Sequence, residues 1–316
     1  MLKISGIVLL CLVGVVVLLL VKNYIDSQRP MLPEDYYTLL EYEMPLERNY
    51  AGIGNYEVKN TVYKSDDKVI GNIRIWYPSE LVESEKQYPM ILVVNASNMA
   101  ALNYEPYFCR LASWGFILVG NDDRQTGTGV TASNTLDFML DLNSDCDSGF
   151  YGKIDETAIG CVGYSQGGAG AINAVTKYEN SGKFTALFTG SAAYALLSTS
   201  MGWEYDISKV TIPYFMTAGT GKSDDTGVAD INAEFGGVAP LASLIQNYEE
   251  ICDDVFKVRA RVAGAEHQEM QMKTDAYMTA WMLYHLQGDA EAGNVFLGEN
   301  AELLDNTSWQ DIEKNQ

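Results

Sequence analysis

Short apolar runs alternate with segments of helical periodicity through most of this 316-residue sequence. Two early runs flank a polar turn and predict an antiparallel hairpin. The later runs are short and separated by helical stretches, a pattern typical of strands buried on both faces of a parallel sheet. The sequence therefore predicts an α/β fold, with a mainly parallel eight-stranded sheet and helices on both faces. The expected strands are residues 56–63, 69–78, 90–96, 116–122, 157–165, 186–192, 212–219 and 255–264, and the expected helices are 105–114, 134–143, 168–180, 240–251 and 274–287.

The N-terminal segment predicts a membrane anchor. Residues 4–21 form a run of 18 residues without a charge, which is just long enough to cross a bilayer as a helix. The run is longer than the apolar core of a signal peptide, and no small-residue cleavage site follows it. We expect an uncleaved signal anchor over residues 1–22, with a cleaved signal and a secreted protein as the alternative. The catalytic domain is then expected outside the cytoplasm.

The rest of the chain divides into two parts. Residues 23–53 are polar and contain two prolines, so they predict a linker. Residues 54–316 predict one catalytic domain. The formal net charge of −21 makes nucleic acids and other polyanions unfavourable partners, which argues against nucleic-acid binding and phosphoryl transfer.

One serine stands in a motif that carries chemistry. The stretch IGCVGYSQGGAGA runs from an apolar strand through Ser165 into a helix of small residues. In the G-x-S-x-G pattern, the chain turns sharply so that the serine oxygen projects above the sheet edge, and glycines avoid clashes there. A short motif of this kind also occurs by chance, but the strand before it and the helix after it favour a nucleophile.

A serine hydroxyl needs a base, and the chain offers two histidines. His267 follows the last expected strand, whereas His285 lies within an amphipathic helical segment, so His267 is the expected base. An acid that orients the imidazole is expected after the preceding strand. Asp224 is the first choice there, Asp225 the second and Asp230 the third.

The negative charge that develops on a reacting carbonyl oxygen needs fixed donors. The backbone N–H of Gln166, directly after the serine, is one expected donor. The second is expected from the loop after residues 90–96, with the backbone N–H of Ser97 as first choice and Asn98 as the alternative. Asp122, Asp123 and Trp203 are further residues that could contact a substrate, although capping and packing roles suit them as well.

These segments resemble the α/β-hydrolase superfamily and, within it, the cutinase, polyester-hydrolase and chlorophyllase group of serine esterases. The resemblance rests on IDETAIGCVGYSQGG, RLASWGFILVGND, VTIPYFMTAGTGKSD and GAEHQEM, and it covers nearly all of residues 54–312. It implies the order nucleophile, acid and base found here in Ser165, Asp224 and His267. Polyester hydrolases place an aromatic residue where this chain has Ser97, and they often have Trp or His, then Met, where Tyr164 and Gln166 stand. An aromatic clamp for a polymer is therefore not supported.

The expected activity is hydrolysis of carboxylic esters through an acyl-enzyme, with small-molecule, lipid or polysaccharide esters as substrates. No metal or organic cofactor is required for this chemistry. A peptidase or amidase on the same fold is one alternative, and a catalytically silent surface binding protein is another.

Overall fold

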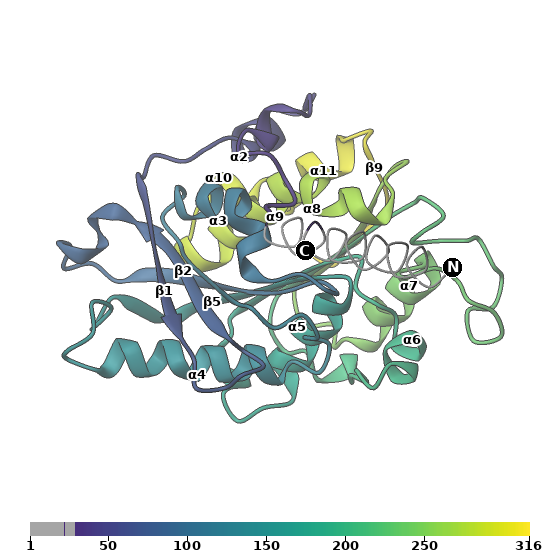
Figure 1. Ribbon diagram of the computed structural model, residues 1–316. Helices are drawn as coiled ribbons and strands as arrows, with labels where there is room; N and C mark the ends of the chain where they lie inside the picture. Colours follow the sequence, from purple (N-terminus) through teal and green to yellow (C-terminus); the bar gives the residue numbers. More distant parts are fainter. Residues whose placement is uncertain (1–21, 23–28) are drawn as a thin grey trace, which may run out of the picture.

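A nine-stranded sheet forms the centre of the computed structural model, which describes residue 22 and residues 29–316. The strand order is β1-β2-β4-β3-β5-β6-β7-β8-β9. Figure 1 shows this sheet with helices on either side of it. Neighbours from β4 through β8 are parallel, whereas the pairs β1–β2, β2–β4 and β8–β9 are antiparallel. The strands are β1 Val58–Lys64, β2 Asn72–Pro78, β3 Tyr88–Val94, β4 Ile117–Asn121, β5 Ile154–Tyr164, β6 Ala186–Gly190, β7 Tyr214–Gly219, β8 Lys257–Val262 and β9 Trp309–Lys314.

The prediction of eight strands is wrong by one, because β9 was missed. The segment WQDIEK is polar, and its burial follows no strict alternation. It pairs with β8 alone at the edge of the sheet, where one side of the strand faces solvent and charged side chains are favoured. The apolar run that identifies a central strand is therefore absent from its sequence.

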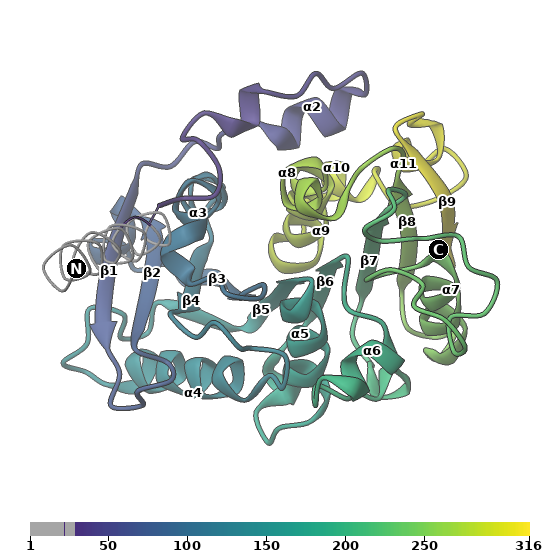
Figure 2. The ribbon, with the colours of Figure 1, turned by 45° about the vertical axis from the view of Figure 1, so that its right-hand side comes forward.

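Helices cover both faces of the sheet, as the sequence predicts (Figure 2). One layer contains α3, α8, α9 and α10, and the opposite layer contains α4, α5, α6 and α7. The α-helices are α2 Pro45–Ala51, α3 Glu105–Ala112, α4 Val130–Ser144, α5 Gln166–Thr176, α6 Ala195–Ser200, α7 Leu241–Glu250, α8 Met270–Lys273, α9 Asp275–Met282, α10 Ala290–Gly293 and α11 Glu302–Asp305. Shorter 3₁₀ turns include η1 Tyr36–Thr38, η2 Ser79–Val82, η3 Ala101–Tyr104, η4 Ser181–Lys183, η5 Ile207–Lys209 and η6 His267–Glu269, and a π-helical turn spans Leu283–Gln287.

Strand β5 contributes apolar side chains to both faces of the sheet, and each helix layer packs on one of these faces. Successive side chains of a strand point to opposite faces. Ile159 and Cys161 lie in the hydrophobic cluster under α4 and α5, whereas Val162 and Tyr164 lie in the cluster under α3 and α9. All four are almost fully buried, so β5 is a central strand that ends directly at Ser165.

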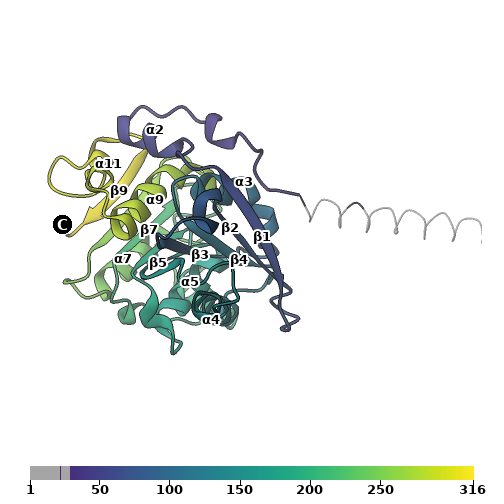
Figure 3. The ribbon, with the colours of Figure 1, turned by 90° about the vertical axis from the view of Figure 1, so that its left-hand side faces the viewer.

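Part of the segment expected to be a linker is built into the fold. Helix α2 packs against α9, and it lies outermost over that layer (Figure 3). The carboxylate of Glu302 accepts hydrogen bonds from the backbone N–H groups of Leu46 and Glu47, at 2.7 and 2.8 Å, and so caps the first turn of α2. These partners are about 255 residues away along the chain, and local sequence therefore gives no sign of them.

A buried ion pair attaches the same N-terminal segment to the core. Arg110 on α3 pairs with Asp275 at the start of α9, and both side chains are almost completely buried. The hydroxyl of Tyr36 donates to Asp275 at 2.5 Å and accepts from Arg110 Nε at 2.9 Å. Arg110 also donates to the backbone oxygens of Tyr50 and Gly52. Buried charges need such partners, so this cluster couples residues 36–52 to the two helices.

Among the described residues, which are residue 22 and residues 29–316, no helix is both long and apolar enough to cross a membrane. The signal anchor expected over residues 1–22 falls, apart from residue 22, outside the described residues.

We expect Tyr36→Phe to lower the free energy of unfolding by about 1–3 kcal/mol, because it leaves buried polar groups of Arg110 and Asp275 without a partner. Tyr37→Phe is the matched control, since the Tyr37 hydroxyl makes no hydrogen bond within the described part of the chain. Urea unfolding monitored by circular dichroism measures both. Equal stability of the two variants would show that the N-terminal segment is not attached in this way.

Candidate active site

Ser165 lies in a strained turn between β5 and α5. Its backbone has φ 57° and ψ −124°, which is unfavourable for a residue with a side chain. A Cβ atom on Gly163 would lie 2.1 Å from the backbone oxygen of Gly167, and one on Gly167 would lie 2.2 Å from the backbone oxygen of Val94. The two glycines therefore let α5 begin directly against β3 and β5, and the N-terminal end of that helix faces the serine.

Asp224 and His267 meet at the same edge of the sheet. Asp224 follows β7, His267 follows β8, and their Oδ1 and Nδ1 atoms are 2.6 Å apart. The Asp224 carboxylate is completely buried. Its second oxygen accepts hydrogen bonds from the Gly219 N–H at 2.8 Å and from the Ser191 hydroxyl at 2.5 Å. Both oxygens of the carboxylate thus have hydrogen-bond partners, which fix its position beside the imidazole.

Ser191 is a functional candidate that the sequence analysis missed. It directly follows β6 and has a positive φ of 47°. A polar residue at the carboxyl end of a parallel strand was the available signal, but nothing in the sequence connects it to a residue 33 positions later.

The other two aspartates considered for the acid have different partners. Asp225 forms an ion pair with Arg261 at 2.6 Å, and its other oxygen accepts from the Gly227 N–H. Asp230 accepts from the N–H of Asn232 in an exposed turn. Neither carboxylate is hydrogen-bonded to His267, so the geometry favours Asp224 over both.

Ser165 and His267 line one pocket of about 240 Å³. Ser97, Met99 and Tyr104 from the loop after β3 form one side of it, and Gln268 and Gln271 lie near His267. Met31, from the segment expected to be a linker, also lines the pocket. Its N–H donates to the backbone oxygen of Asn103 at 2.8 Å, which holds the N-terminal segment beside the loop after β3.

Most backbone donors of the loop after β3 have partners. The N–H of Ala96 donates to the Tyr104 hydroxyl, that of Asn98 to the Arg124 oxygen and that of Met99 to the Ala96 oxygen. The Ser97 N–H has no hydrogen-bond partner in the described part of the chain. Gln166 is the first residue of α5, where the N–H has no partner within the helix. The backbone N–H of Ser97 is therefore better placed than that of Asn98, the alternative, to donate a hydrogen bond into the pocket.

Asp122 and Asp123 have structural partners. Asp122 pairs with Arg74 at 2.9 Å and accepts from Asn72. Asp123 accepts from the Gln125 N–H and the Thr131 hydroxyl, which shapes the loop before α4. Trp203 packs on Gly127, where an added Cβ would lie 2.3 Å from the indole ring. None of the three lines the pocket that contains Ser165.

His285 lies in the π-helical turn and packs against Trp281, Phe256 and Tyr284. Its Nε2 atom is buried without a hydrogen-bond partner in the described residues. Burial lowers the pKa of His285 from 6.5 to about 4. His285 is therefore a packing residue, and none of the three aromatic residues that it contacts lines the pocket that contains His267.

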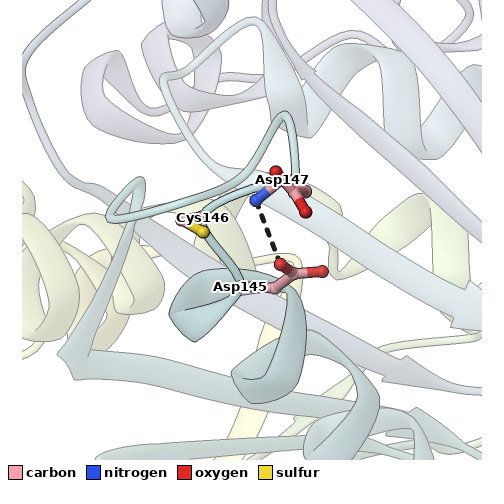
Figure 4. Close-up of side chains that lie close together, drawn as sticks. All are labelled: Asp145, Cys146 and Asp147. Atoms are coloured by element: carbon pink, nitrogen blue, oxygen red, sulfur yellow. Dashed lines mark hydrogen bonds between the residues drawn. The ribbon is translucent and has the colours of Figure 1, made fainter.

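Asp145, Cys146 and Asp147 lie close together after α4 (Figure 4). All three are exposed, and Asp145 accepts a hydrogen bond from the Asp147 N–H at 3.0 Å, an arrangement common in turns. Asn143, at the end of α4, bonds the N–H of Ile154 at the start of β5. The cluster thus lies at the end of the sheet opposite Ser165, and these contacts give it no role in the pocket.

The sheet topology, the turn at Ser165 and the position of the pocket define an α/β-hydrolase. Residues 48–313 match the model of the PET hydrolase-like family, and the chain belongs to that family. A search of curated proteins finds no match. The resemblance to polyester hydrolases and cutinases is thereby confirmed, and membership of the family implies an ester hydrolase of the α/β-hydrolase type.

We expect His285→Phe to reduce the loss of stability in acid. Because the folded-state pKa of His285 lies near 4 and its ordinary value is 6.5, the unfolded chain binds this proton first as the pH falls. The neutral histidine thus contributes stability above pH 6.5 that is lost between 6.5 and about 4. Urea unfolding of both proteins at several pH values measures the difference. Parallel stability profiles for wild type and variant would contradict the assignment.

Proposed function

We propose that this protein hydrolyses carboxylic esters through a Ser165–His267–Asp224 triad and an acyl-enzyme intermediate. The observation that carries the proposal is the 2.6 Å contact between His267 and the buried Asp224, at a pocket that Ser165 also lines. A serine, a base and an acid that orients the base are the groups that acyl transfer needs.

The proposed reaction begins when Ser165 Oγ attacks the ester carbonyl carbon and His267 Nε2 takes the hydroxyl proton. Asp224 accepts the hydrogen bond of the Nδ1–H, which keeps Nε2 free as the base and stabilises the imidazolium. The imidazolium then gives its proton to the leaving alcohol, and the acyl group remains on Ser165. Water, activated by His267, attacks this acyl-enzyme and releases the acid.

The backbone N–H groups of Gln166 and Ser97 are the proposed donors to the oxyanion. Gln166 begins α5, so the helix dipole adds to the effect of its own N–H. The Ser97 N–H has no partner among the described residues, whereas the N–H groups of Ala96, Asn98 and Met99 in the same loop are occupied. Fixed donors of this kind stabilise the tetrahedral intermediate without reorganisation during the reaction.

Ser165→Ala is expected to lower kcat on 4-nitrophenyl butyrate by about 10⁴-fold or more, because the nucleophile is lost while binding groups remain. Release of 4-nitrophenol measures the rate, and circular dichroism checks that the variant is folded. Equal turnover by wild type and variant would refute the proposal.

The same preparation distinguishes the two alternatives. Faster turnover of aminoacyl nitroanilides than of esters would favour a peptidase or amidase. Failure of a fluorophosphonate probe to label Ser165 in the folded protein would favour a silent binding protein.

Asp224→Asn is expected to lower kcat by about 10⁴-fold, because an amide cannot hold the imidazole in the productive tautomer. Asp225→Asn is the matched control, since Asp225 pairs with Arg261 and does not contact His267. The Asp225→Asn variant is expected to lower the free energy of unfolding while kcat stays close to that of wild type. Initial rates at saturating 4-nitrophenyl butyrate compare the two. A larger loss of kcat in Asp225→Asn would assign the acid to that residue instead.

A further inference from the structure

Gln271 is a buried polar residue whose side chain has no hydrogen-bond partner among the described residues. It lies on α8, four residues after His267, and its side chain lines the pocket that contains Ser165. Only 5% of the residue is exposed. Neither Nε2 nor Oε1 has a hydrogen-bond partner in the described part of the chain. A buried amide without partners is unfavourable, and native proteins rarely contain one without a functional reason.

The other buried polar side chains of the pocket wall already have hydrogen-bond partners. The hydroxyl of Tyr104 accepts from the Ala96 N–H at 2.8 Å. The hydroxyl of Tyr164 contacts Tyr107 at 3.2 Å and Thr274 at 3.3 Å. Met31 and Met99 are apolar, and Gln268 is exposed to solvent. Gln271 is therefore the buried side chain of this described wall in which both polar atoms lack a partner, so both its donor and its acceptor are available to a ligand.

We propose that Gln271 is a specificity residue, which hydrogen-bonds a second oxygen-bearing group of the ester substrate. This inference rests on the proposed ester hydrolysis. A carboxamide both donates and accepts, so a hydroxyl group, which does the same, satisfies both of its ends. The pocket of about 240 Å³ is below the usual size of drug-like ligand sites, so the group that enters it is short. The substrate class is thus short esters with a hydroxyl group near the scissile carbonyl.

A pocket built to bind a hydroxyl group discriminates strongly against the analogue that lacks it, because the buried amide then stays unpaired. An apolar pocket gives no such discrimination. The proposal therefore concerns the ratio of kcat/KM values for matched substrates, rather than the activity on any single ester.

Two substrate pairs test the inference on either side of the ester. One pair is 4-nitrophenyl butyrate and 4-nitrophenyl 3-hydroxybutyrate, and the other is ethyl butyrate and 2-hydroxyethyl butyrate. Wild type is expected to prefer the hydroxylated member of at least one pair by about tenfold or more in kcat/KM. Gln271→Met, of similar length and apolar, is expected to bring that ratio close to one. Gln268→Met is the comparison variant at the exposed mouth, and it is expected to retain the ratio.

A second measurement is independent of turnover. Gln271→Met is expected to raise the Tm, because it removes an unpaired buried amide, whereas Gln268→Met is expected to leave the Tm close to that of wild type. A lower Tm for Gln271→Met would show that the protein itself satisfies the amide, and it would overturn the inference.

The remaining outcomes of these experiments distinguish failure of the Gln271 inference from failure of the proposed function. No preference in either pair, a preference that survives in Gln271→Met, or an equal loss in Gln268→Met would overturn the role of Gln271 while leaving ester hydrolysis intact. Absence of turnover for every ester would refute the proposed function, and this inference with it.

Discussion

The buried carboxylate of Asp224 joins the ends of three neighbouring strands. Ser191 after β6, Gly219 at the end of β7 and His267 after β8 all have a hydrogen bond to it. A charge that is completely removed from water is costly unless such partners surround it. The fold of this edge and the position of the imidazole therefore depend on one another, since loss of any donor leaves the carboxylate undersatisfied.

The sequence predicts the centre of the molecule well, for physical reasons. Central strands are buried on both faces, so their apolar runs stand out, and Ser165, Asp224 and His267 each follow such a run. The edge strand β9 was not predicted, because half of it faces solvent and its sequence lacks an apolar run. The glycines beside Ser165 are visible in the sequence, but the contacts that require them, with backbone atoms of β3 and α5, become visible only in three dimensions.

Features that depend on distant partners could not be predicted. The polar composition of residues 23–53 predicts a linker. Tyr36 and helix α2 nevertheless pack into the fold, because their partners lie far along the chain on α3, α9 and α11. Ser191 looks like any polar residue after a strand until Asp224 is placed beside it. Nothing in the sequence distinguishes Gln271 from the other glutamines, and it becomes a candidate only because it is buried without a partner among the described residues.

Met31 and Tyr36 are five residues apart, yet one lines the pocket and the other belongs to the buried cluster with Arg110 and Asp275. The same short segment thus forms part of the pocket wall and also attaches the N-terminal region to the core. The pocket wall at Met31 comes from the N-terminal part of the chain, whereas Ser165, Asp224 and His267 come from its middle and its C-terminal half. The shape of the pocket and the Asp224–His267 contact therefore depend on different parts of the sequence.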